Sequence, residues 1–344
     1  MKNTRWQIPA LAALGAITLA SLVACGGGDD NGPGWQTDAS GNVKLKFAAY
    51  NGTTPIDCST SLKLGTKARA VKMADFRFYI SNVNLIKADG SKVALKLKST
   101  DDYNYTDGTN SVSLIDLEQS GTGLCAGGSG TTNAVIEGTV PPGSYVGAEM
   151  TLGVPFALNH LNAADAGTPR VLQTAVHPGM SWNWRGGRKF TNIEFDQDRA
   201  ADANAWESAA PGQDGYVLLH LGSTGCVGDP ANGTPISSCK APNRVPVALP
   251  NFDPTKQVIA FDAGALFNYD IASLGEGNSG CMSGPTDRGC VKPFEALALN
   301  FGQPVRDANG QVVLDDKGYP KIDGAGTGQP LAGKSQAVLK AVTP

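Results

Sequence analysis

Three histidines and two tryptophans are the side chains best suited to chemistry in this sequence. The histidines are His160, His177 and His220, and Trp182 and Trp184 follow His177 closely. Neutral imidazoles bind first-row transition metals, and in an exported, oxidising setting such ligands favour copper over iron. One hypothesis is therefore a single copper site shared by the three histidines. The alternative is that each histidine is an isolated structural residue and that the tryptophans belong to the core.

Other kinds of chemistry find little support in the sequence. It contains no G-x-S-x-G nucleophile motif, no P-loop, and no G-x-G-x-x-G following a strand. The formal net charge of −3 argues against nucleic acid as a partner. We therefore expect a binding protein rather than an enzyme.

The N-terminus has the layout of a secretory signal. Lys2 and Arg5 precede an apolar run that ends in Leu-Val-Ala-Cys, with Cys25 last. This tetrapeptide resembles a lipobox, so residues 1–24 are interpreted as a lipoprotein signal peptide and residues 25–40 as a lipidated flexible tether. The alternatives are an ordinary secreted protein and a membrane-spanning helix, but the apolar run is shorter than the roughly 20 residues of such a helix. The expected location is the periplasmic side of a membrane or the cell surface, with the outer membrane favoured.

The cysteines fit an oxidising compartment. The chain has seven, and assigning Cys25 to lipid leaves an even set of six. Proximity in the sequence predicts three pairs, although about fifteen connectivities are possible for six cysteines. A zinc site is disfavoured, because no pair has the short ligand spacing of structural zinc. The predicted disulfides, of which the last two are placed in loops rich in glycine, proline and serine, are Cys58–Cys125, Cys226–Cys239 and Cys281–Cys290.

Short alternating segments predict that the rest of the chain is all-β. Val43, Leu45 and Phe47 alternate with lysine, and similar apolar runs recur between Gly, Pro, Asn and Asp residues. We expect one domain, residues 41–344, folded as an antiparallel β-sandwich with long disulfide-stapled loops, few short helices and a C-terminal hairpin extension. Short helical turns are expected near 172–176 and 264–268, and a pair of hairpins over 307–326.

These elements place the candidate side chains near strand ends. In an extended 216–221, Tyr216, Leu218 and His220 share one face, and the following turn directs His220 toward the rim of the sandwich. His160 follows a strand that ends in Gly-Val-Pro-Phe. If the segment after His177 is extended, Trp182 and Trp184 share a face.

Four segments carry most of the candidate residues: Phe76–Ile86, Gly153–His160, Met180–Trp184 running on to Phe190, and His220–Cys226. All three histidines lie within or just before them. In the same order, these segments resemble those of the MbnP-like family of methanobactin-associated copper proteins, also called metallo-mystery-pair four-cysteine proteins. Arg188 stands where a tyrosine is expected in that family; an arginine at such a position is otherwise usually solvated.

The resemblance implies an exported, β-rich copper-binding protein that acts as a carrier, store or sensor. It also implies a partner similar to di-haem cytochrome c peroxidases (MbnH-like), which oxidises one tryptophan to kynurenine. Carried over to this sequence, His160 and His220 are the first copper ligands, His177 is the third, and Trp182 or Trp184 is the oxidised residue. Two alternatives stay open: a metal-free binding or adhesion lipoprotein, and a copper oxidoreductase.

Overall fold

The computed structural model describes residues 34–118, 125, 131–182, 187–204, 206–207, 215–275 and 280–344, all of which belong to one compact unit. Strands account for 41% of the chain and helices for 8%, which confirms the all-β prediction. The predicted signal peptide, the predicted lipidation site Cys25 and Trp184 lie outside the described residues. Within the described ranges, no helix has the length and apolar character needed to cross a membrane.

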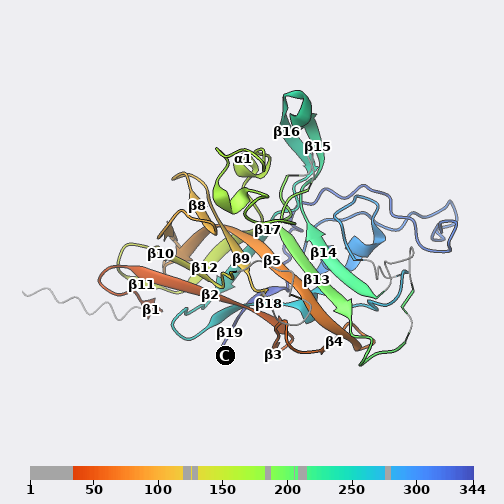
Figure 1. Cartoon of the computed structure of the whole chain (residues 1–344), viewed down its shortest axis with the longest axis horizontal. Coiled ribbons are helices and arrows are strands. Elements are labelled where there is room, and N and C mark those ends of the chain that lie inside the picture. Colours follow the sequence, from red (N-terminus) through yellow and green to blue (C-terminus); the bar gives the residue numbers. More distant parts are fainter. Residues whose placement is uncertain are drawn as a thin grey trace, which may run out of the picture. The chain divides into compact units, whose positions relative to one another are not determined.

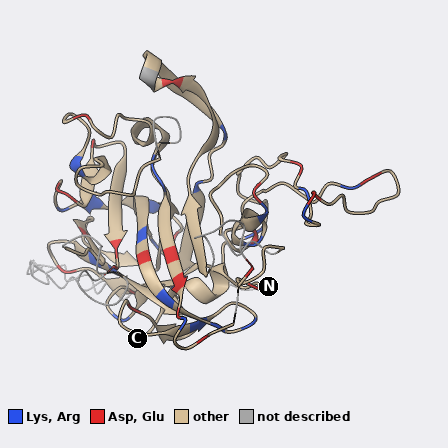
Figure 2. Ribbon diagram, turned by 45° about the vertical axis from the view of Figure 1, so that its right-hand side comes forward, with Lys and Arg blue, Asp and Glu red and all other residues tan. Residues whose placement is uncertain are grey.

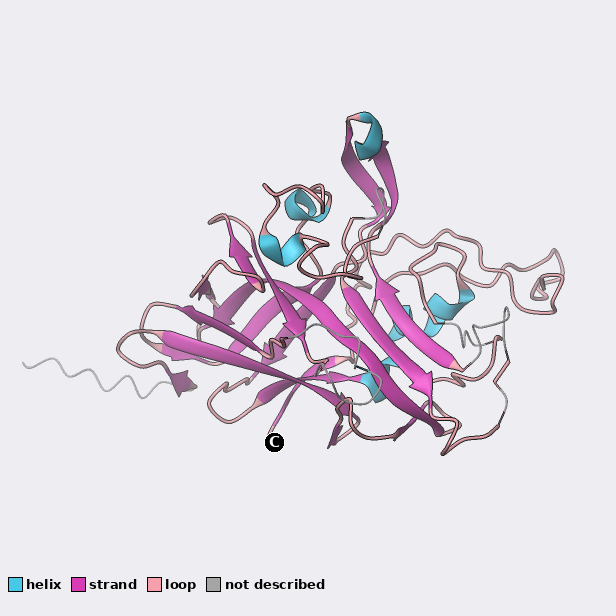
Figure 3. Cartoon of the chain, in the orientation of Figure 1, coloured by secondary structure: helices cyan, strands magenta, loops and turns pink. Residues whose placement is uncertain are grey.

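Two sheets form the body of the protein (Figures 1 and 3). Among the named strands, every pairing is antiparallel except the parallel pair β18 and β2. The larger sheet runs in the order β14 (Tyr216–Leu221), β13 (Thr191–Gln197), β5 (Arg69–Ile86), β12 (Gly147–Leu152), β17 (Val245–Pro250), with β4 (Leu62–Leu64), β6 (Lys92–Ala94), β8 (Asn104–Thr106) and β9 (Ser111–Asp116) attached. The smaller runs in the order β19 (Leu339–Val342), β18 (Val258–Asp262), β2 (Asn42–Asn51), β10 (Val135–Thr139), β7 (Lys96–Leu97), with β3 (Thr54–Pro55) attached.

Aromatic side chains join the inner faces of the two sheets. The ring of Phe76 on β5 lies 5.2 Å from that of Phe261 on β18, and the Phe78 ring lies 4.9 Å from Phe261. Because side chains alternate along a strand, the residues between these phenylalanines point to the opposite face of the larger sheet. That outer face of β5 carries Asp75, Arg77 and Tyr79, all of them buried.

Loops and short helices cover this outer face. Tyr79 donates a hydrogen bond from its hydroxyl to the carbonyl of Val171, which anchors the loop that carries η2. The helical turns are α1 (Phe156–Asn159), η2 (Arg170–Leu172), η3 (Pro230–Asn232), α2 (Ala263–Leu266), η4 (Arg288–Cys290) and α3 (Val291–Ala296). Of the predicted turns, 264–268 overlaps α2 and 172–176 overlaps the end of η2, whereas α3 was not predicted.

All three predicted disulfides are present: Cys58–Cys125, Cys226–Cys239 and Cys281–Cys290. The prediction that Cys226 and Cys239 lie in loops is wrong, because they face each other across β15 (Thr224–Asp229) and β16 (Thr234–Ala241). Figure 1 shows this hairpin projecting from the sheets beside α1. A second small ribbon pairs β1 (Trp35–Gln36) with β11 (Ser144–Tyr145).

The C-terminal part forms the expected pair of hairpins. Isolated bridges join Arg306 to Val312 and Leu314 to Pro320, and an outer bridge joins Pro304 to Ile322. Each inner bridge closes a turn in which the side chain of Asp307 or Asp315 accepts backbone N–H groups. Such aspartate turns need little core, which is why the sequence pattern located them well.

Candidate metal centre

The outer face of the larger sheet brings polar residues of three strands together. Asn192 on β13 pairs with His220 on β14 and with Arg77 on β5, and Glu194 pairs with Asp75. A register shift follows Glu194, and such bulges often lie next to functional sites. Acidic and basic bands lie side by side on neighbouring strands in Figure 2. His220 therefore belongs to a polar face that loops cover.

His220 presents one ring nitrogen for ligation. Its Nε2 lies 2.7 Å from Glu194 Oε1, and this hydrogen bond is the main reason why the pKa of Glu194 lies below its usual value. The ionised carboxylate accepts, so Nε2 carries the proton and Nδ1 keeps its lone pair when the ring is neutral. Nδ1 is buried and has no hydrogen-bond partner. A carboxylate that orients a histidine in this way is common behind metal ligands.

Trp182 lies directly beside His220. The two ring centroids are 6.0 Å apart and the rings are nearly perpendicular. Trp182 Nε1 is buried and has no hydrogen-bond partner. A Cβ atom added at Gly222 would lie only 2.4 Å from this nitrogen, so the absence of a side chain there makes room for the indole.

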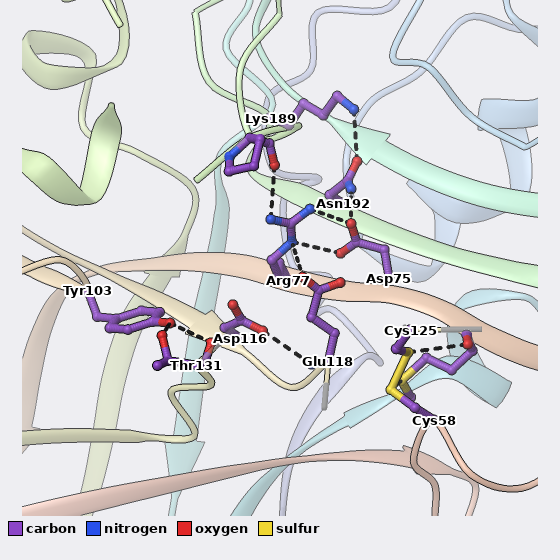
Figure 4. A network of polar contacts seen from close by, with 12 residues as sticks. Cys58, Asp75, Arg77, Tyr103, Asp116, Glu118, Cys125, Thr131, Lys189 and Asn192 are labelled. Carbon is purple, nitrogen blue, oxygen red and sulfur yellow. Dashed lines mark hydrogen bonds and ion pairs between the residues drawn. A yellow bond between two sulfur atoms is a disulfide. The ribbon is translucent and has the colours of Figure 1, made fainter. Parts of the chain in front are cut away.

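A cation is fixed over the Trp182 ring. Lys189 Nζ lies 5.5 Å from the ring centroid and donates a 2.8 Å hydrogen bond to Asn192 Oδ1. Asn192 in turn donates to Asp75, which is also bonded to the Arg77 guanidinium. Figure 4 shows this chain of contacts. Burial lowers the pKa of Lys189, although nearby carboxylates, Glu194 first, oppose the shift.

His160 directly follows α1, and its hydrogen-bond partner is the side-chain amide of Asn159, whereas that of His220 is a carboxylate. Asn159 Oδ1 accepts the backbone N–H of Arg188, which identifies Nδ2 as the amide nitrogen that donates to His160 Nε2 at 3.0 Å. In the neutral ring, Nε2 therefore has the lone pair and Nδ1 has the proton. Burial, together with Arg244 and Arg188, lowers the pKa of His160 to about 4, so the ring is neutral at pH 7.

Arg188 is buried, not solvated, which corrects the usual expectation for such a residue. It is 1% exposed and donates to the carbonyls of Leu172, Asn159 and Leu161. Its Nη2 has no hydrogen-bond partner, and burial lowers the pKa of its guanidinium group. Arg188 therefore holds the backbone on both sides of His160 in place.

His177 is bound in surroundings of its own. Its Nε2 donates to the carbonyl of Asp102, and its ring lies 5.0 Å from the ring of Tyr103. Nδ1 is buried without a partner, and burial lowers the pKa of the imidazole. The carbonyl of Pro178, the next residue, accepts from Arg77. These contacts hold the His177 ring against Asp102 and Tyr103, and the next residue joins its loop to Arg77 of the polar network.

The three histidines thus do not form one compact ligand set. Trp182 is the link between two of them, since it lies against His220 and lines a cavity of about 600 Å³ together with His160 and Arg188. Within the parts of the chain that the structure describes, no group of three ligand atoms within 4.8 Å contains more than one histidine. The group that contains His160 is completed by Cys226 and Cys239.

The MbnP family model matches residues 40–283, which is more than half of the chain and includes all three histidines and both candidate tryptophans. The chain belongs to the MbnP family. This confirms the resemblance inferred from the four segments and identifies a methanobactin-associated protein. The structure is similar to that of MbnP from Methylosinus trichosporium, with a TM-score of 0.65 and 27% sequence identity over 88% of this chain and 98% of that one. A search of curated proteins finds no significant match.

Sequence reasoning missed three residues of this site. Glu194 lies between buried Ile193 and Phe195, so strand alternation points it outward, but its pairing with His220 requires the β13–β14 register. Lys189 and Asn159 lie within two of the four family-like segments, but the sequence assigned neither of them a role. No local signal distinguishes them from ordinary surface positions.

Proposed function

We propose that this MbnP-family chain is an exported, lipid-anchored copper-binding protein that serves as a carrier, store or sensor and is not itself an enzyme. The observation that supports this proposal most directly is the lone pair of His220 Nδ1, buried without a partner next to Trp182, while Glu194 holds the opposite ring nitrogen. Imidazole nitrogen is a donor that suits copper.

In the proposed site, His220 is the first ligand and Trp182 lies in or beside the coordination shell. His160 lines a cavity together with Trp182 and is the second candidate ligand. His177 is kept as a weaker candidate, because the carbonyl of Asp102 and the ring of Tyr103 already hold it. The expected partner is a di-haem protein that oxidises a tryptophan to kynurenine, whose aniline nitrogen adds a further donor for copper. Trp182 is the described candidate for this oxidation.

Copper binding is tested on the mature protein with its disulfides intact, expressed with and without its own di-haem partner. Metal analysis should find copper, and His220→Ala should weaken copper binding by more than about tenfold, since loss of even an indirect contact to a metal ligand costs that much. His177→Ala tests the weaker candidate and should reduce copper binding much less than His220→Ala does, because the carbonyl of Asp102 and the ring of Tyr103 already hold that imidazole. Equal affinity in His220→Ala and wild type would contradict the proposed site.

If every preparation of folded protein is free of metal, the alternative of a binding or adhesion lipoprotein is favoured.

The lipid anchor is tested separately. Cys25→Ala should release the protein from the membrane fraction or block its processing, and continued cleavage with full membrane attachment would contradict a lipid at Cys25. Peptide mass spectrometry after co-expression with the partner distinguishes Trp182 from Trp184 as the oxidised residue.

A further inference from the structure

A second cluster of metal-binding side chains lies where the β15–β16 hairpin meets the end of α1. His160 Nε2 is 3.5 Å from Cys239 Sγ. Ligand atoms of His160, Cys226 and Cys239 all lie within 4.8 Å of one another, and all three residues are partly exposed. In the oxidised protein the two sulfur atoms are bonded to each other and cannot act as thiolates.

We propose that reduction of the Cys226–Cys239 disulfide creates a metal site of two thiolates and the His160 imidazole, selective for a soft monovalent cation such as Cu(I). Thiolates select Cu(I), and three donors of this kind suffice for it. The site does not depend on the copper function proposed above, since it forms in a different oxidation state of the protein; His160 is the one candidate ligand that the two proposed sites share.

Accessibility makes this disulfide the first to be reduced. Cys58 is 2% exposed, and Cys125, Cys281 and Cys290 are all 0% exposed. Cys226 and Cys239 are partly exposed on a hairpin that projects from the sheets (Figure 1). Thiol–disulfide exchange requires direct approach of the attacking sulfur, so a dithiol reaches this pair before the other two.

The hairpin keeps the two thiols together after reduction. Cys226 and Cys239 are directly opposed in an antiparallel register, with the pairs Thr224–Ala241 and Val227–Ser238 on either side. Their Cα atoms are 3.8 Å apart. Directly opposed residues of a strand pair project their side chains to the same face, so both sulfur atoms stay beside His160.

The surroundings of His160 favour its role as the third ligand. The amide of Asn159 donates to Nε2, so the nitrogen nearest to Cys239 is the one with the lone pair, and a metal bound there would take the place of this hydrogen bond. Arg188 and Arg244 lie close enough to lower the pKa of this imidazole. Two thiolates and Cu(I) carry one net negative charge, which these guanidinium groups compensate.

The chemistry balances with a dithiol as the reductant. One dithiol thiolate attacks a sulfur of the bridge, forms a mixed disulfide and breaks the Cys226–Cys239 bond. The second dithiol sulfur then closes the reductant's own disulfide and leaves two cysteine thiols, a transfer of two electrons and two protons. On binding Cu(I), the two thiols release their protons to water.

The proposal is tested by titrating oxidised protein and mildly reduced protein with Cu(I), supplied as its bicinchoninate complex. The dithiol is removed from the reduced sample under anaerobic conditions before the titration. Reduced protein should take up one further Cu(I) per chain and show near-ultraviolet thiolate-to-copper absorption that oxidised protein lacks. Alkylation should map the new thiols to Cys226 and Cys239. No additional uptake on reduction, or thiols mapped only to the other cysteines, would overturn the proposal.

Variants separate the three ligands. Cys226→Ser combined with Cys239→Ser should abolish the absorption, and His160→Ala should weaken the additional binding by more than about tenfold. Gly167→Ala, whose added Cβ would meet only Asp165 Oδ1 at 3.4 Å, serves as the control and should leave it unchanged. Undiminished binding in His160→Ala would overturn the three-ligand site. Failure of copper binding by the oxidised protein, in contrast, would count only against the proposed function.

Discussion

Gly222→Ala tests whether the position of Trp182 beside His220 controls copper binding. The added Cβ would lie 2.4 Å from Trp182 Nε1 and 3.0 Å from the carbonyl oxygen of Arg188. The backbone cannot easily yield, because the N–H of Gly222 donates to Ser283 Oγ and its carbonyl accepts from Asn243 Nδ2. The indole must therefore move by about 1 Å to reach ordinary contact, and such overpacking costs about 1–3 kcal/mol.

Because metal sites tolerate deviations of only about 0.2 Å, this movement should weaken copper binding by about tenfold or more. The measurements are copper titration of the oxidised protein, indole fluorescence, and the free energy of unfolding in denaturant. Gly167→Ala is the matched control, since its Cβ would meet only Asp165 Oδ1 at 3.4 Å. Wild-type copper affinity in Gly222→Ala, with altered fluorescence proving that the indole moved, would refute the role of Trp182.

Three further predictions concern the same region. Glu194→Gln should weaken copper binding by about 10- to 100-fold with little loss of stability, because it changes only the group that orients His220; unchanged affinity in the titration would contradict this. Arg188→Met should lower the free energy of unfolding by about 3 kcal/mol, because three carbonyl groups lose their donor; a change under about 1 kcal/mol would show that the guanidinium is dispensable. In the metal-free protein, the pKa of His160 is about 4 against 6.5 for the model group, so the unfolded chain binds the proton first. Stability should fall as pH decreases from about 6.5 to about 4, and His160→Gln should flatten this slope in denaturant titrations.

Strand alternation predicted most of the fold correctly. The expected segment 216–221 coincides with β14, and Val43, Leu45 and Phe47 are the buried face of β2. Among the strands that escaped prediction, β15, β16 and β17 contain residues that usually end strands. β17 begins and ends near Pro246 and Pro250, and β15–β16 contains two glycines and a proline. Pairing with neighbours overrides these local preferences, and it cannot be read from a single segment.

For the candidate site, the sequence predicted individual residues but not their positions relative to one another. The sequence identified His160, His220 and Trp182, and the structure places Trp182 next to His220 and on one cavity with His160. Their relative positions depend on the β13–β14 register and on loops far apart in the chain. The burial of Arg188 illustrates the limit, since nothing in its neighbourhood distinguishes it from a solvated arginine.

The order in which the smaller sheet can form follows from its strand arrangement. β2, near the start of the described chain, pairs with β18, whose other neighbour is β19, the last strand. About 200 residues must be available before β2 can find β18, and pairings so distant in sequence form slowly. The sheet therefore cannot close until the chain has been made as far as β19. For an exported chain, as proposed here, such a topology delays closure of this sheet until β19 is available on the far side of the membrane.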